Sequence, residues 1–223
     1  MMNYRVDTLE LGAFTTESGE KIENLKLQYE HVGYPGQPLV LVCHALTGNH
    51  LTYGTEENPG WWREIIDGGY MPLHDYQFLT FNVIGSPFGS SSRVTDQNFP
   101  QHLTMRDIAH ALEKGIEALG FRKIDVLIGG SLGGMQALEL LYRHKFEVEK
   151  AVILAATAKT SSYSRAFNEI ARQAIHIAGK EGLSIARQLG FLTYRSSKSY
   201  EARFTPDEVL SLIHISEPTR PLY

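Results

Sequence analysis

The sequence predicts an α/β fold, with a mostly parallel sheet flanked by helices, and three observations support this prediction. Between residues 39 and 154, apolar segments short enough to be strands alternate with segments whose apolar residues recur every three or four positions. This alternation is typical of parallel strands joined by crossover helices. A glycine-rich turn joins one of these strands to the helix after it. The 223 residues can form a hydrophobic core without disulfides.

The first forty residues are expected to be mainly β. Residues 25–30 alternate between apolar and polar side chains, which indicates a strand with one buried face and with Lys26, Gln28 and Glu30 on the other. Glycine and proline between positions 33 and 38 mark a turn. Residues 39–43 and 78–84 are predicted to be buried strands. We expect a short helix at 61–67 and loops at 47–60 and 85–100.

Helical periodicity begins at residue 104. Thr104 and Asp107 resemble a capping box, and Gly120 stands where a helix ending near residue 119 would have its C-cap. Strands are predicted at 124–128 and 151–154, with a helix at 133–142 between them. Helical stretches at 166–178 and 183–189 follow, without a strong strand. We therefore expect a core domain at 1–159 and a helical lid at 160–210.

The composition excludes several classes of protein. Hydrophobic residues make up 43% and charged residues 21%, which argues against disorder, and the net charge of −4 gives no basic field for nucleic acid or an anionic membrane. The single cysteine, Cys43, is expected to be a small buried hydrophobe, and no zinc-type spacing points to a metal. The first residues lack the apolar run of a signal peptide. We expect a soluble, cytoplasmic protein.

The most informative segment contains Gly-x-Ser-x-Gly at residues 129–133, between a predicted strand and a predicted helix. A serine on such a turn is exposed, and Gly129 and Gly133 leave room for its strained backbone. Ser131 is therefore the candidate nucleophile. A glycine-rich turn without chemistry or a phosphate cradle are the alternatives, although neither Gly-x-Gly-x-x-Gly nor a P-loop lysine is present.

A second segment, residues 44–48, follows the strand at 39–43. In sheets with a serine at such a turn, the loop after an early strand and the residue after the serine each supply a backbone N–H to the oxyanion hole. The predicted donors are those of Leu46 and Leu132. His44 precedes the serine in the chain and is interpreted as a structural histidine.

Several segments together resemble the homoserine O-acetyltransferase family of the α/β-hydrolase superfamily. They are residues 44–48 (HALTG), 82–85 with 89–91, 129–138 (GGSLGGMQAL) and 166–175 (AFNEIARQAI). The resemblance covers roughly residues 5–210 and implies an α/β-hydrolase fold with a helical lid.

The resemblance implies a two-step acyl transfer. Ser131 would take the acetyl group of acetyl-CoA, a substrate and not a bound cofactor, and L-homoserine would accept it to give O-acetyl-L-homoserine on the route to methionine. Succinyl-CoA is an alternative donor. The family also implies a homodimer through lid helices, and the apolar spacing of Ile170, Ala174, Ile175 and Ala178 permits this or packing onto the core.

The carboxylate of homoserine needs a cationic partner, and an arginine fork can bind it bidentately. Arg195 matches a lid motif of the family, so it is the candidate substrate-binding residue. The alternative is that Arg195 pairs with a nearby glutamate. Arg63, Arg165 and Arg172 are weaker candidates.

A serine nucleophile needs a base and an orienting acid, in the chain order Ser, Asp or Glu, His. Downstream of Ser131 stand Asp207 and three histidines, His144, His176 and His214, none in a loop after a late strand. Residues 211–221 resemble a translated sequencing adapter, so residues 211–223 are interpreted as a tail that is not native to the protein. We therefore expect an N-terminal fragment that lacks the C-terminal part of the core and is itself inactive.

Two other functions remain open from the sequence. One is a related enzyme, either an esterase or a transferase that acylates serine or another alcohol, because the turn around Ser131 does not distinguish these reactions. The other is a module without catalysis that binds a partner through its lid helices.

Overall fold

The computed structural model describes residues 2–204. Contacts divide the chain into one unit up to Ala158 and a second that begins at Lys159. Among the described residues, no helix is long and apolar enough to cross a membrane. The predictions made for Asp207, His214 and the segment 211–223 lie outside the described residues.

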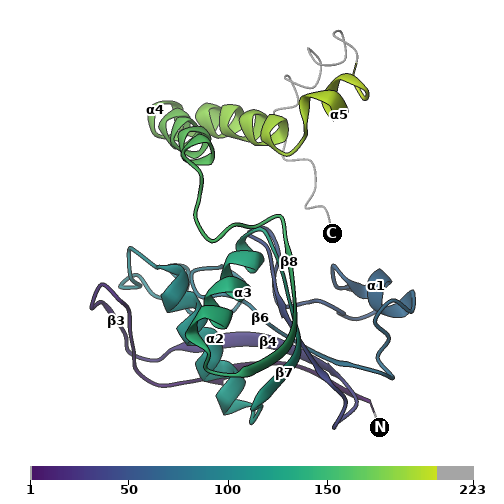
Figure 1. Ribbon diagram of the computed structural model, residues 1–223. Coiled ribbons are helices and arrows are strands. Elements are labelled where there is room, and N and C mark those ends of the chain that lie inside the picture. The colour runs from purple at the N-terminus through teal and green to yellow at the C-terminus, as the bar shows by residue number, and fades with distance from the viewer. Residues whose placement is uncertain (1, 205–223) are drawn as a thin grey trace. The chain divides into compact units, whose positions relative to one another are not determined.

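The first unit is built on a six-stranded sheet (Figure 1). In spatial order its strands are β1 (Asn3–Glu10), β4 (Lys26–Gly33), β6 (Gln77–Phe81), β5 (Leu39–Cys43), β7 (Lys123–Gly130) and β8 (Glu147–Leu154). The neighbours from β6 to β8 pair in parallel, whereas β4 pairs antiparallel with both β1 and β6. The predicted mostly parallel α/β sheet is confirmed. Strands β2 (Phe14–Thr15) and β3 (Lys21–Ile22) form a separate hairpin.

Both faces of the central strand β5 are buried. Leu39, Leu41 and Cys43 belong to a cluster that includes residues of α2 (Met105–Ala118) and α3 (Leu132–Arg143), whereas Val40 and Val42 belong to a second cluster with α1 (Arg63–Asp67). Figure 1 shows α2 and α3 together on one face of the sheet. A strand covered on both faces explains why its sequence is continuously apolar.

The ends of α2 follow the sequence signals. The Thr104 side chain accepts a hydrogen bond from the Asp107 backbone N–H, and the Asp107 carboxylate accepts one from the Thr104 backbone N–H. This reciprocal capping box is confirmed. After the helix, Gly120 has a φ of +83°, which the missing Cβ makes inexpensive.

Two local predictions are wrong. Strand β6 ends at Phe81, so Asn82 to Ile84 belong to the following loop. Glu30, expected on the solvated face of β4, is buried at 1% exposure. Its carboxylate accepts hydrogen bonds from the backbone N–H groups of Thr52, Tyr53 and Gly54, each at 2.7 Å. The loop after β5 folds over this face of the sheet, which residue alternation alone does not reveal.

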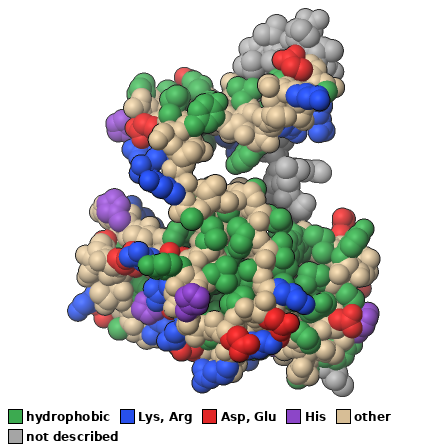
Figure 2. All heavy atoms as spheres, in the orientation of Figure 1, with side chains coloured by type: hydrophobic (Ala, Val, Ile, Leu, Met, Phe, Trp, Pro, Cys, Tyr) green, Lys and Arg blue, Asp and Glu red, His purple; other side chains and the backbone are tan. Residues whose placement is uncertain are grey.

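The second unit contains α4 (Ser162–Thr193) and α5 (Ser197–Glu201). Helix α4 has two arms because Gly179 leaves the helical conformation at φ 53° and ψ −119°. The arms approach closely, since a Cβ on Gly182 would overlap the carbonyl of Ala174. Apolar side chains remain on its surface, as Figure 2 shows for one face, and they include Tyr163, Ile170, Ile177 and Ile185.

Candidate active site

Strand pairing brings the two predicted site segments together at the carboxyl ends of neighbouring strands. Strands β5 and β7 are parallel neighbours, with Cys43 opposite Gly129 near their carboxyl ends. The loop that begins at His44 and the turn at Ser131 therefore start side by side. Carboxyl ends of parallel strands are where ligands bind in open α/β sheets.

Ser131 occupies a strained backbone conformation between β7 and α3, with φ 54° and ψ −120°. Gly179 has nearly the same angles, at φ 53° and ψ −119°, and there no Cβ opposes them. A non-glycine residue there costs about 1–3 kcal/mol. The backbone N–H of Ser131 donates to the Leu154 carbonyl at 2.9 Å, and its side chain is exposed. The turn thus presents the hydroxyl at the sheet edge.

Glycines around Ser131 allow α3 to sit directly on the strand ends. A Cβ on Gly129 would overlap the carbonyl of Gly133, and one on Gly133 would overlap the carbonyl of Cys43. The expected role of Gly129 and Gly133, to leave room in the turn, agrees with these contacts. They also show a second role, which is the close approach of α3 to the end of β5.

The predicted oxyanion donors lie on these adjoining segments. Leu46 is in the loop after β5, and Leu132 is the first residue of α3. Within residues 2–204, neither backbone N–H donates to a protein acceptor, and the Ser131 hydroxyl has no hydrogen-bond partner. All three groups are therefore available to a ligand.

His44 has both ring nitrogens engaged. Its Nδ1 donates to the Ala45 carbonyl at 2.8 Å, and its Nε2 accepts from the Val83 backbone N–H at 3.1 Å. Burial lowers the pKa of the imidazole, so the neutral form that these bonds require is favoured. These bonds agree with a structural histidine and leave no nitrogen free to take a proton from Ser131.

The neighbouring thiol does not compete as a nucleophile. Cys43 is buried, and burial raises its pKa to about 12. The thiolate, which is the reactive form, is therefore scarce at neutral pH. This agrees with its expected role as a small hydrophobe.

Arg195 lies just after α4 on an aromatic cluster. Its guanidinium carbon is 4.6 Å from the Phe191 ring centre and 5.7 Å from that of Phe204. Cation–π contact uses the face of the guanidinium and leaves its N–H edge free. Among the described residues, no carboxylate forms an ion pair with Arg195. The alternative that Arg195 pairs with a nearby glutamate is therefore not seen in this part of the chain.

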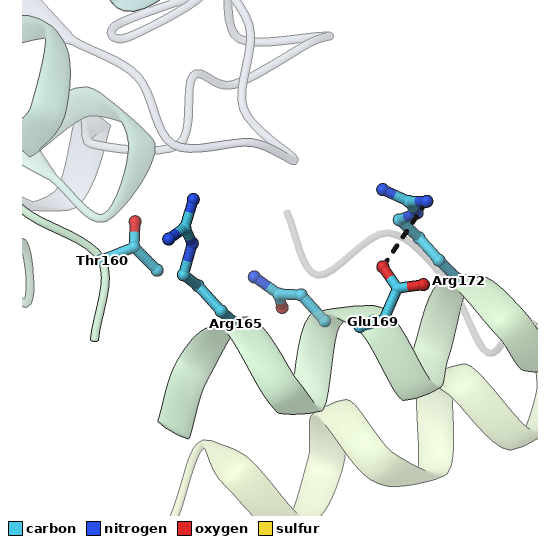
Figure 3. Close-up of a pocket in the computed structure, with 5 residues that line it drawn as sticks. Thr160, Arg165, Glu169 and Arg172 are labelled. Atoms are coloured by element: carbon cyan, nitrogen blue, oxygen red, sulfur yellow. Dashed lines mark ion pairs between the residues drawn. The ribbon is translucent and has the colours of Figure 1, made fainter. Parts of the chain in front are cut away.

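Two of the weaker arginine candidates share an open hollow of about 380 Å³ along the first arm of α4 (Figure 3). Arg165 and Arg172 line it, and Arg172 pairs with Glu169 at 3.5 Å. Arg195 is not among its lining residues. Arg63 is engaged elsewhere, since it pairs with Asp67 at 3.2 Å and stacks on Tyr53.

The downstream histidines that the structure describes belong to helices. His144 caps the C-terminus of α3 in a left-handed conformation, and His176 lies within α4. In the described part of the chain, no group of three or more His, Cys, Asp or Glu residues is arranged to hold a metal ion.

Sequence reasoning missed Gln136 on α3. This residue is 1% exposed, and its Nε2 donates to the His44 carbonyl at 3.1 Å. A signal existed, because Gln136 is a polar residue within the buried stripe of α3, spaced three or four residues from Gly133 and Leu140.

The chain is similar in sequence to known proteins. A family model described as the alpha/beta hydrolase fold matches residues 38–178. Homoserine O-acetyltransferase of Methanobrevibacter ruminantium is 35% identical over 217 residues, covering 84% of this chain and 44% of that protein. Homoserine O-succinyltransferase of Leptothrix cholodnii is also 35% identical, over 86% of this chain and 59% of that protein.

A solved structure is more similar still. The crystal structure of homoserine O-acetyltransferase from Staphylococcus aureus is 77% identical, with a TM-score of 0.88, over 95% of this chain and 64% of that one. The chain thus spans about half the length of the two curated relatives named above and about two thirds of the solved one.

Proposed function

Because this chain belongs to the alpha/beta hydrolase family, we propose that the whole protein transfers an acetyl group from acetyl-CoA to the side-chain hydroxyl of L-homoserine. The observation that carries the proposal is the backbone of Ser131, held at φ 54° and ψ −120° between β7 and α3. Strain of this kind at an exposed serine indicates a nucleophile. The acceptor and the transferred acetyl group come from the names of the similar enzymes, and acetyl-CoA is proposed as the donor on the family resemblance of the sequence.

The reaction divides into two displacements at Ser131. First, the serine oxygen attacks the thioester carbonyl, and coenzyme A leaves as its thiol with the proton taken from the serine. Next, the homoserine hydroxyl attacks the acyl-serine, which yields O-acetyl-L-homoserine and returns a proton to Ser131. In each step the carbonyl oxygen becomes an oxyanion, to which the backbone N–H groups of Leu46 and Leu132 would donate hydrogen bonds.

The free N–H edge of Arg195 supports a role in holding the homoserine carboxylate. In the whole protein, Arg195→Ala is expected to raise the KM for homoserine about tenfold or more, with little change in the KM for acetyl-CoA. Arg187→Ala, on the second arm of α4, is the matched control. Arg165→Ala tests the competing arginine in the hollow, and a larger effect there would transfer the role to Arg165.

Succinyl transfer is the second candidate, because a homoserine O-succinyltransferase is also 35% identical to this chain. The deciding experiment incubates the purified whole protein with acetyl-CoA or succinyl-CoA and with homoserine or serine, and identifies products by mass spectrometry. O-Acetylhomoserine formed by the wild type and not by Ser131→Ala is the expected result. Hydrolysis without transfer would instead indicate an esterase.

The proposal extends to the location, the oligomeric state and the cofactor requirement of the whole protein. The product fits a cytoplasmic step of methionine biosynthesis, and the exposed Ile170, Ile175 and Ile177 on α4 support a homodimer formed through the helical unit. Sedimentation of the whole protein, with Ile177→Glu as a comparison, tests the second point. No cofactor is needed, since acetyl-CoA supplies the transferred group.

A further inference from the structure

Two parts of the proposed oxyanion hole come from separate segments of the chain. Leu132 belongs to α3, whereas Leu46 belongs to a loop that begins 88 residues earlier in the sequence. A hydrogen-bond donor lowers the barrier only if it points at the place where the negative charge develops. Something must therefore hold the loop at a set distance from the helix.

The contact that joins them is made by a buried amide. Gln136 Nε2 donates to the His44 carbonyl at 3.1 Å, two residues before Leu46, and Gln136 lies five residues after Ser131 on α3. The same carbonyl lies against Gly133, where a Cβ would come within 3.0 Å of it. Helix α3 thus touches the start of the loop at two successive turns.

The other side of His44 is fixed as well. Its imidazole accepts from the Val83 N–H at 3.1 Å and donates to the Ala45 carbonyl at 2.8 Å. The bond from Val83 holds the ring against the loop after β6. Among the described residues of α3, Gln136 is the one whose side chain hydrogen-bonds to the backbone of His44.

The Gln136 side chain is not optimised for stability. Its Oε1 is buried and has no hydrogen-bond partner among the described residues. A buried acceptor without a donor costs free energy, and an apolar side chain of similar size would avoid that cost. The geometry of the amide is nevertheless well defined, because reversing it would place two oxygens against each other.

We propose that Gln136 is a positioning residue, which holds the Leu46 N–H in register with Ser131 and Leu132 by binding the His44 carbonyl. This inference rests on the proposed use of Ser131 as an acyl-accepting nucleophile. It does not depend on which alcohol or acyl donor the protein uses.

The test measures acylation of Ser131 in the whole protein with p-nitrophenyl acetate. Gln136→Met keeps the length of the side chain and removes the N–H donor. We expect kcat to fall at least about tenfold with KM within about twofold, because the donor acts on the transition state and not on the bound ester. The affinity for an alkylboronic acid, whose tetrahedral serine adduct fills the oxyanion hole, should weaken in parallel.

Leu140→Ala is the matched control, since it removes buried volume from the same helix without touching the loop. It should lower the melting temperature while kcat at 25 °C stays near that of the wild type. Gln136→Leu, which also lacks the donor and adds no titratable group, replaces Gln136→Met if the latter does not fold.

A Gln136→Met kcat within twofold of the wild type would overturn the inference, and so would an equal loss of kcat in Leu140→Ala. The proposed acceptor is tested separately. If the wild type hydrolyses p-nitrophenyl acetate through Ser131 but does not acetylate homoserine, the proposed function fails and the test of Gln136 still stands.

Discussion

At the residue scale, the site depends on positions where only a hydrogen fits. Gly133 has no Cβ because the carbonyl of Cys43 occupies that space. Gly130, next to Ser131, is different, since the nearest atom to a Cβ there is the Leu154 carbonyl oxygen at 3.8 Å. The two glycines thus form a natural pair for comparison.

Gly133→Ala is expected to destabilise the protein by about 3 kcal/mol, because α3 must move away from β5 or the strand end must distort. Gly130→Ala should change the free energy of unfolding by less than about 1 kcal/mol in either direction. Urea denaturation of both variants measures the difference. Equal losses would mean that the close approach of α3 to Cys43 is not required.

His50 is expected to make the stability of the fold depend on pH. It is 8% exposed, and burial, with a smaller contribution from nearby His44, lowers its pKa from 6.5 to about 4. The unfolded chain therefore binds more protons than the folded one between these values, so stability is full above pH 6.5 and is lost as the pH falls toward 4.

Between pH 7 and pH 4.5 this group should cost about 2 kcal/mol of the free energy of unfolding. His50→Gln is expected to flatten the pH dependence of the urea midpoint by that amount. His74→Gln, on an exposed histidine, is the control. Parallel curves for the wild type and His50→Gln would contradict the assignment.

At the element scale, α4 is a pair of helical arms joined at Gly179. Gly182 lets the second arm approach the first at Ala174, whereas Gly190 on the same arm has only the Tyr194 ring near it, at 3.9 Å. The helical periodicity in the sequence predicted both arms. It did not predict the contact between them, which depends on how the chain reverses.

Gly182→Ala is expected to separate the arms and to speed amide hydrogen exchange in residues 165–178, measured by mass spectrometry. Gly190→Ala should slow exchange in its own arm, because alanine favours a helix by up to about 1 kcal/mol over glycine. If both variants had the same effect on the first arm, the close contact at Ala174 would not hold the arms together.

At the scale of the whole molecule, Ser131 and the proposed oxyanion donors, Leu46 and Leu132, lie in the first unit at the carboxyl ends of the parallel strands β5 and β7. Strand β8 is an edge strand of the sheet. In the described part of the chain it pairs only with β7, and its residues Val152 and Leu154 are exposed. An exposed parallel edge strand with apolar side chains favours association.

Residues 1–223 expressed alone are expected to transfer little acetyl group to homoserine, less than about one hundredth of the rate of the whole protein, because no described residue contacts the Ser131 hydroxyl as a base. Turnover with acetyl-CoA, together with size-exclusion chromatography, measures activity and association. Turnover by residues 1–223 at the rate of the whole protein would refute the prediction.

Much of this architecture follows from local sequence. Apolar runs and helical spacing predicted β5, β7, α2 and α3, because residues that must be buried repeat with the period of the element. The Gly-x-Ser-x-Gly turn identified Ser131, since few other patterns fit a strained serine between a strand and a helix.

Tertiary structure decided the rest, because it depends on residues far apart in the chain. The burial of Glu30 requires the loop at Thr52 to fold over β4, and the contact of Gln136 with His44 joins positions 92 residues apart. The sequence by itself thus determined which serine is presented. Only packing between β5, the loop after it and α3 decided which residues contact the proposed oxyanion donors, because the order of residues does not say which distant segments meet.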